Sequence, residues 1–172
     1  MRIIIPALLA SAILVMPALA QAPATSAAPP SFASVPPDTP PVTFVTAAEV
    51  MAMAAKSKAV RKDEPQLNTP LLVLPPYRSQ VEYRGSAGPP AVHETEAEMM
   101  FVADGGATLV TGGKMIGEKR TNATNLTGTG IEGGESRHFA KGDWAIIPQG
   151  VPHQIAAVDG SVTLVTLHVP RT

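Results

Sequence analysis

The most informative stretch of this 172-residue chain is GDWAIIPQGVPH, residues 142–153. Its apolar run, Trp144 to Ile147, is bounded by Gly142-Asp143 on one side and by Pro148-Gln-Gly150 on the other. Glycine beside a polar residue, and proline near glycine, are typical of turns. The stretch therefore predicts a short strand between two turns. His153 follows the second turn and is expected to lie on a different strand.

A second group of chemically informative residues lies earlier in the chain. Alternate side chains of a β-strand share a face, so Ala91, His93 and Thr95 are expected to point into the same interior. Glu98 is expected after a turn or bulge, at the start of a strand over Met99–Val102. A carboxylate that enters an apolar strand costs several kcal/mol unless it is paired or bound to a cation. The pattern indicates a polar site inside a β structure.

Together the two groups resemble the paired short motifs of the cupin superfamily. The second motif departs from the family at Ala157, where asparagine is usual, and matches at Gly142, Pro148, Gly150 and His153. The first departs at Ala91, where the family usually has its first histidine, and matches at Gly85, His93, Glu98 and Gly105. The resemblance covers the chain from about Thr69 to Thr172. It implies a jelly-roll β-barrel, or double-stranded β-helix, that holds one metal ion or small ligand.

The resemblance also implies a metal centre. The family's usual ligands are three histidines and a glutamate, whereas this chain supplies His93, Glu98 and His153. Two imidazoles and one carboxylate on one face of an octahedral ion leave positions open for substrate or water. The chain has no cysteine, so the expected divalent ion (Fe, Mn, Zn or Ni) has only nitrogen and oxygen ligands. Either the site has three ligands and an extra open position, or the pocket has lost the metal and binds an organic ligand directly.

The two remaining histidines are not assigned as ligands. His138 precedes Phe139, so the two side chains face opposite sides, and His138 is interpreted as a surface residue. His168 shares strand parity with Leu164 and Thr166 on the last strand. That parity allows either a place beside the pocket or an exposed edge.

The chain from Thr69 to Thr172 predicts one all-β domain. Short apolar runs alternate there with glycine-rich turns, a rhythm typical of sandwiches and barrels. The turns include Asp104-Gly-Gly106 and Asp159-Gly160. The expected strands lie at Leu71–Leu74, Gln80–Tyr83, Met99–Val102, Ala107–Val110, Trp144–Ile147 and Val162–Leu167.

The residues before this domain predict export. Residues 1–20 have the parts of a signal peptide: a basic start at Met1-Arg2, an apolar run from Ile3 to Met16, and small residues in Ala18-Leu-Ala20. The mature chain would then begin at Gln21 and be periplasmic or secreted. Residues 21–43, rich in proline and alanine, are interpreted as an extended linker.

Residues 44–68 are expected to form a helical extension. Thr46 and Glu49 have the spacing of a capping box before an apolar segment. A helix from about Ala47 to Ala59 is predicted, and Pro65 lies beyond its end.

Charge and composition limit the classes of partner that this protein is expected to bind. The net charge is −1, from 13 basic and 14 acidic residues without a basic run, which disfavours nucleic acid and anionic membranes. A small organic molecule is the expected partner, with a homodimer as a possible assembly. The enzyme hypothesis is oxygenation, isomerisation or a lyase step, with Tyr83, Glu96 and Arg137 as further acid–base candidates. The alternatives are a binding barrel without turnover and a barrel that serves mainly in dimerisation.

Overall fold

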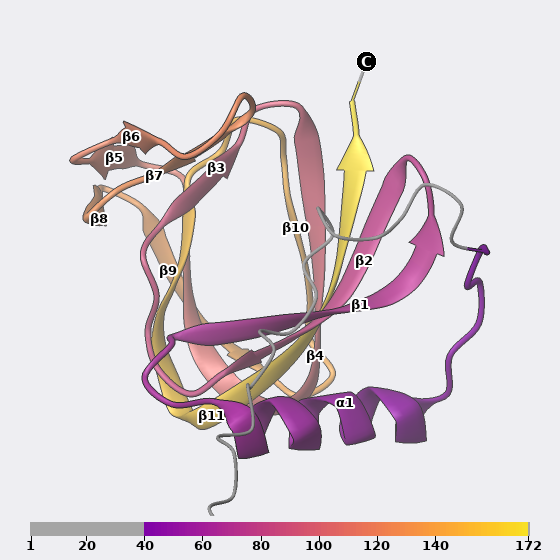
Figure 1. Ribbon diagram of the computed structural model, residues 1–172. Coiled ribbons are helices and arrows are strands. Elements are labelled where there is room, and N and C mark those ends of the chain that lie inside the picture. Colours follow the sequence, from indigo (N-terminus) through magenta and orange to yellow (C-terminus); the bar gives the residue numbers. More distant parts are fainter. Residues whose placement is uncertain (1–39, 172) are drawn as a thin grey trace, which may run out of the picture.

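The structure, a computed structural model, describes residues 40–171 (Figure 1). In that part of the chain one helix, α1 (Ala47–Val60), precedes a succession of strands. These are β1 (Gln66–Leu74), β2 (Tyr77–Arg84), β3 (Ala91–His93), β4 (Glu96–Thr111), β5 (Lys114–Ile116), β6 (Lys119–Arg120), β7 (Asn125–Thr127), β8 (Gly130–Glu132), β9 (Glu135–Ala140), β10 (Trp144–Ile147) and β11 (His153–Pro170). The prediction of an all-β fold with one short helix is confirmed.

The strands form two layers that share β4 and β11. In sheet I, the second half of β11 lies between β2 and the first half of β4, with β1 and β10 outside them. In sheet II, the first half of β11 pairs with β3 and with the second half of β4, and β7, β6 and β9 extend this layer. A small separate ladder joins β5 to β8. This is the predicted jelly roll, although its ladder is not closed into a ring.

The two shared strands are longer than predicted. Asp104-Gly-Gly106 and Asp159-Gly160, expected as turns between strands, lie inside β4 and β11. The register between the two strands shifts between Val158 and Val162, and Val162 pairs with Gly105. A bulge bends a strand without reversing it. The glycines therefore carry each strand from one sheet into the other.

Gly105 is predicted to be essential at this bend. Its φ is +77°, and an added Cβ would lie 2.1 Å from the Ser161 carbonyl oxygen. Gly105→Ala should lower the free energy of unfolding by about 2–4 kcal/mol, from left-handed strain and forced backbone movement. Gly160→Ala is the control, because Gly160 has the same φ but no atom within 4 Å of the added Cβ, and it should cost about 1 kcal/mol. Equal losses for both variants in urea unfolding would contradict this account.

The interior between the sheets changes character along its length. Toward the bend it is apolar, and toward the free ends of β4 and β11 the inward side chains become polar. The apolar cluster comprises Met100, Val102, Ala107, Leu109, Phe139, Ile147, Ile155, Val162 and Leu164. The polar inward residues on the same two strands include Glu98, His153, Thr166 and His168. The fold thus has a packed end and a polar end.

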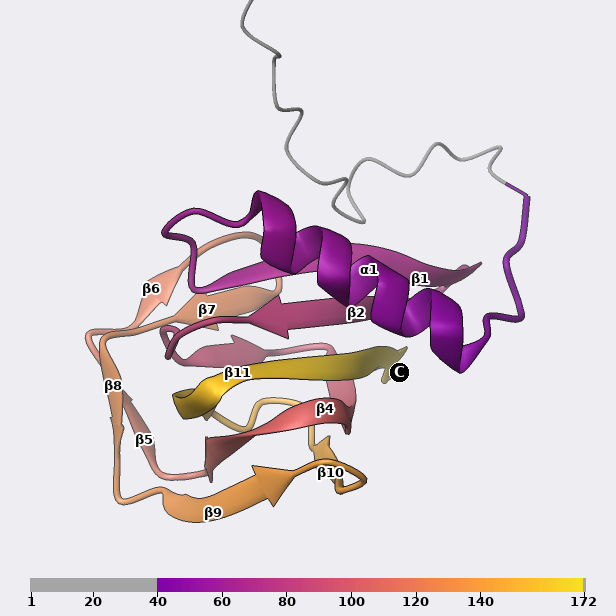
Figure 2. The ribbon, with the colours of Figure 1, turned by 90° about the horizontal axis from the view of Figure 1, so that it is seen from below.

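Helix α1 covers the outer face of sheet I, across β1 and β2 (Figure 2). Thr46 Oγ1 accepts a hydrogen bond from the Glu49 amide, and the Glu49 carboxylate accepts one from the Thr46 amide, so the predicted capping box is present. Val50 and Ala54 pack with Leu71, Val81 and Tyr83. Because side chains alternate along β2, this packing turns Glu82 and Arg84 toward the interior.

The sheet begins earlier than predicted. β1 starts at Gln66, inside the segment expected to be a helical extension, and Val42 adds an isolated bridge to Val73. The predicted signal peptide, and the predicted linker up to residue 39, lie outside the described residues. Between residues 40 and 171, no helix combines the length and apolar character needed to cross a membrane.

Candidate metal centre

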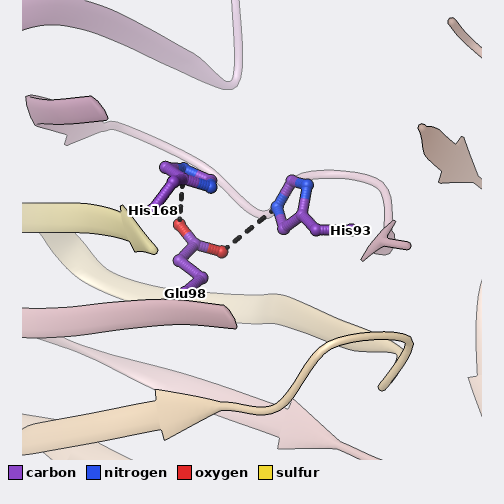
Figure 3. Close-up of side chains that lie close together, drawn as sticks. All are labelled: His93, Glu98 and His168. Carbon is purple, nitrogen blue, oxygen red and sulfur yellow. Dashed lines mark ion pairs between the residues drawn. The ribbon is translucent and has the colours of Figure 1, made fainter. Parts of the chain in front are cut away.

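Four polar side chains from three strands meet at the polar end of the interior. Glu98 and His168 come from sheet I, where they are direct ladder partners on β4 and β11. His93 ends β3 and His153 begins β11, both in sheet II. Figure 3 shows the Glu98 carboxylate lying between the rings of His93 and His168. Both layers of the jelly roll therefore contribute to one site.

The Glu98 carboxylate is the centre of this group. Its Oε2 lies 3.3 Å from Nε2 of His93 and 3.0 Å from Nε2 of His153. Its Oε1 lies 3.5 Å from Nε2 of His168. Glu98, His153 and His168 are buried, and His93 is half-buried. Three imidazoles thus face one carboxylate that is almost removed from water.

The other ring nitrogens of His93 and His153 are already engaged. Nδ1 of His93 donates to Oδ1 of Asn125 at 2.7 Å, and Nδ1 of His153 donates to the Val151 carbonyl oxygen at 3.2 Å. A hydrogen on Nδ1 leaves Nε2 of a neutral ring with a lone pair. Both lone pairs then face the same oxygen of Glu98. That arrangement is repulsive unless a cation, either ring protons or a metal ion, offsets it.

The pKa values follow from the same contacts. Burial alone would raise the pKa of Glu98, but hydrogen bonds with His153 and His93 and the charge of neighbouring histidines hold that pKa far below its usual range. Burial opposes protonation of His93, yet its hydrogen bond to Glu98 and the Glu98 charge raise its pKa. Burial lowers the pKa of His168 to about 4, against the attraction of Glu98. The site is therefore built around an ionised carboxylate.

These residues fit a divalent ion. Ligand atoms of His93, Glu98 and His168 all lie within 4.8 Å of one another, and Nε2 of His153 is 3.0 Å from Glu98. Metal bonds of about 2.1 Å put neighbouring ligand atoms about 3 Å apart. Imidazole and carboxylate suit zinc, iron and other first-row ions. Metal binding by His93, Glu98 and His153 stays a prediction. The structure brings these three side chains together, as metal binding requires.

The neighbours of these residues differ from expectation. Ala91 lines the cavity beside His93 as predicted and pairs with His153 across the ladder, but Thr95 is exposed. β3 ends at His93 and β4 restarts at Glu96, so the alternation is reset between them. Glu96 consequently lies on the same face as Glu98, and Thr95 does not point into the interior as predicted.

Two of the acid–base candidates are elsewhere. Tyr83 is buried in the cluster under α1, on the opposite face of β2 from the site. Arg137 is exposed and pairs with Glu135. Glu96, the third candidate, contacts His168 at 3.4 Å. His138 is exposed and pairs with Asp159, which confirms its interpretation as a surface residue.

A cavity of about 590 Å³ opens onto the site. Its volume lies within the range of small-molecule pockets. His93, Glu98, His153 and His168 line one part of it. The wall formed by β1 and β2 is mainly polar and consists of Gln66, Asn68, Arg78, Gln80, Glu82 and Arg84. A ligand reaching the histidines would therefore meet many hydrogen-bonding groups.

Asn125 is predicted to increase metal affinity through its hydrogen bond with His93. Removing the amide that fixes Nδ1 should free the ring to rotate or to change tautomer. Asn125→Ala is expected to weaken metal affinity by about 10-fold, as loss of an outer hydrogen-bond partner typically does. Asn122→Ala in the same loop, an exposed position, should leave affinity unchanged. Titration with Zn²⁺ against a competing chelator measures both, and identical affinities would disprove the role of Asn125.

No family model matches the chain, and no curated protein matches it. Among solved structures, a candidate mannose-6-phosphate isomerase from Ralstonia eutropha JMP134 is 19% identical, with 65% of this chain and 92% of that chain covered and a TM-score of 0.47. KdgF from Halomonas sp. is also 19% identical, with 65% and 87% covered and the same TM-score of 0.47. FeII HppE is 17% identical, with 63% and 53% covered and a TM-score of 0.48.

These neighbours are cupin-fold proteins. The fold of this chain is assigned from its own strand pairing. Two sheets share β4 and β11, and each of these two strands bends at a glycine. The chain therefore has a jelly-roll fold, with a His–Glu–His group in its interior.

Proposed function

We propose that this protein binds one divalent metal ion through His93, Glu98 and His153 and uses it to act on a small polar organic molecule. The observation that carries the proposal is the direction of the two imidazoles. Hydrogen bonds at Nδ1 of each ring aim Nε2 of both at one buried carboxylate oxygen. A metal ion between them would turn this repulsion into coordination and would compensate the buried charge of Glu98.

The chemistry would be that of a Lewis acid or redox ion with free positions toward the cavity. A bound Fe, Mn, Zn or Ni ion would polarise an oxygen of the substrate, and Fe, Mn or Ni would also support its oxidation. The protein's own residues would orient the substrate: Gln80 and Asn68 offer amide donors and acceptors, and Arg84 offers a guanidinium. Oxygenation, isomerisation and elimination are the reaction types in keeping with such a site.

The polar side chains on the β1–β2 wall of the cavity favour a substrate that can form hydrogen bonds. Glu82 and Arg84 pair with each other on the cavity wall, so these two formal charges largely cancel. Amide groups dominate the rest of that wall. The preferred molecule would therefore be small and would carry hydroxyl or carbonyl groups that can pair with this wall.

We further propose that the protein works outside the cytoplasm. Support comes from residues 1–20, with their short basic start, apolar run and Ala18-Leu-Ala20. The absence of cysteine makes a histidine and carboxylate site compatible with an oxidising compartment. Mass spectrometry of the protein from its host should find a chain that begins at Gln21, and a soluble cytosolic chain with Met1 intact would contradict export.

Elemental analysis of the purified mature protein tests the metal proposal. We expect one metal ion per chain, and in His153→Ala less than about one-tenth of that amount, because a lost ligand also leaves Glu98 undercompensated. His138→Ala is the matched control, since His138 is exposed and distant from Glu98 in the fold. Equal metal content in all three proteins, or none in the wild type, would favour a barrel that binds an organic ligand directly.

A further inference from the structure

His168 lies between two carboxylates at the edge of the proposed centre. Its Nε2 is 3.5 Å from Oε1 of Glu98, and its Nδ1 is 3.4 Å from Oε2 of Glu96. The residue is 4% exposed, and its Nδ1 is buried without a hydrogen-bond partner. An unsatisfied buried nitrogen costs about 1–3 kcal/mol. The sheet therefore holds His168 in a place where its own hydrogen bonding is incomplete.

The register of sheet I fixes this placement. His168 is the ladder partner of Arg78 on β2 and of Glu98 on β4. Arg78 in turn contacts both oxygens of Glu96. Glu96 is thereby held against Nδ1 of His168, while Nε2 faces Glu98. Arg78 and Glu96 form a charged pair behind the ring, on the side away from Glu98.

Each His168 nitrogen has a role if a metal ion is present. A hydrogen on Nδ1 would be donated to Glu96, a small movement from 3.4 Å, and Nε2 would then offer its lone pair to the ion. A carboxylate behind a ligating histidine fixes its tautomer and increases its basicity. The ring of His168 also meets that of His93 edge to face at 4.7 Å between centroids. The two Nε2 atoms approach different oxygens of Glu98, Oε2 for His93 and Oε1 for His168.

We propose that His168 is the fourth ligand of the metal centre and that the Arg78–Glu96 pair is its positioning device. This inference rests on the proposed metal site of His93, Glu98 and His153. It supplies a third imidazole from the last strand, β11, while Ala91 on β3 contributes no ligand atom. The centre would then draw two ligands from each sheet.

Co²⁺ serves as the probe, because its visible absorption spectrum responds to ligand number. We expect wild-type protein to bind one Co²⁺. His168→Ala and the closer-sized His168→Gln should both lose Co²⁺ to excess chelator at least about 10-fold faster, with a changed spectrum. Glu96→Gln should also accelerate the loss of Co²⁺, by a smaller factor. Glu132→Gln, an exposed carboxylate on β8, should behave as the wild type, and thermal melting confirms that each variant is folded.

The outcomes separate this inference from the function on which it rests. A His168→Gln protein with the wild-type spectrum and dissociation rate, beside a His153→Ala protein that loses Co²⁺, would overturn the fourth ligand and leave the proposed site standing. A change in His168→Gln without any change in Glu96→Gln would overturn the positioning role of Glu96. No Co²⁺ binding by the wild type would overturn both the proposed function and the fourth ligand.

Discussion

Replacing Glu98 with glutamine is expected to reduce metal affinity by about 100- to 1000-fold. Glu98 is 4% exposed and contributes the negative charge on which three imidazoles converge. A neutral amide keeps the shape but cannot offset the charge of the ion, and the loss of one partner of a buried charged group costs about 3–5 kcal/mol. Competition with a chelator of known affinity measures the change.

The matched control for this prediction is Glu94→Gln. Glu94 lies in the segment between β3 and β4 and pairs with Arg120 at 2.6 Å, away from the histidines. Its variant should bind metal as the wild type does. If Glu98→Gln also keeps wild-type affinity, the ion is not held by this carboxylate, and the converging histidines have another purpose.

Replacing Ala91 with histidine is expected to tighten metal retention by about 100-fold, the upper end of what a single supporting residue of a metal site contributes. Ala91 lines the same cavity as His93 and pairs with His153, so a longer side chain there can reach the centre. The half-time of metal loss to excess chelator measures the gain. The same substitution in the His168→Ala protein should recover most of the lost retention.

The control for added histidine is Ala157→His. Ala157 is exposed on β11, so an imidazole there adds a metal-binding group at the surface and none in the cavity. Retention should stay at the wild-type value. A gain of equal size in Ala157→His would mean that the ion is held at the surface, and no gain in Ala91→His would mean that the cavity leaves no position vacant beside His93.

The fold was predictable from short-range features. Glycine and proline around Trp144–Ile147 mark real turns, and Gly142 and Gly150 adopt φ values of +93° and +75°, which few other residues tolerate. The capping box at Thr46 likewise depends on residues three positions apart. The bends at Gly105 and Gly160 were misread as reversals because a positive φ in glycine serves a turn and a bulge equally well.

The candidate site was predictable only in part. His93, Glu98 and His153 were found because motif spacing reports where each lies on its own strand. His168 was not assigned, since its approach to Glu98 depends on the register between β4 and β11, which strand parity alone does not specify. Thr95 was misplaced because the alternation was carried through residues 94 and 95, where the chain leaves one strand and begins the next.

The central claim is that His93, Glu98 and His153 bind one metal ion, and a crystal structure of the metal-loaded protein with anomalous diffraction tests it most directly. Data collected on both sides of the absorption edge of the bound element locate the ion. The account predicts one strong anomalous peak about 2.0–2.2 Å from Nε2 of His93, Nε2 of His153 and a carboxylate oxygen of Glu98. A peak at the surface, away from Glu98, or an organic molecule in contact with these three side chains with no peak between them, would contradict it.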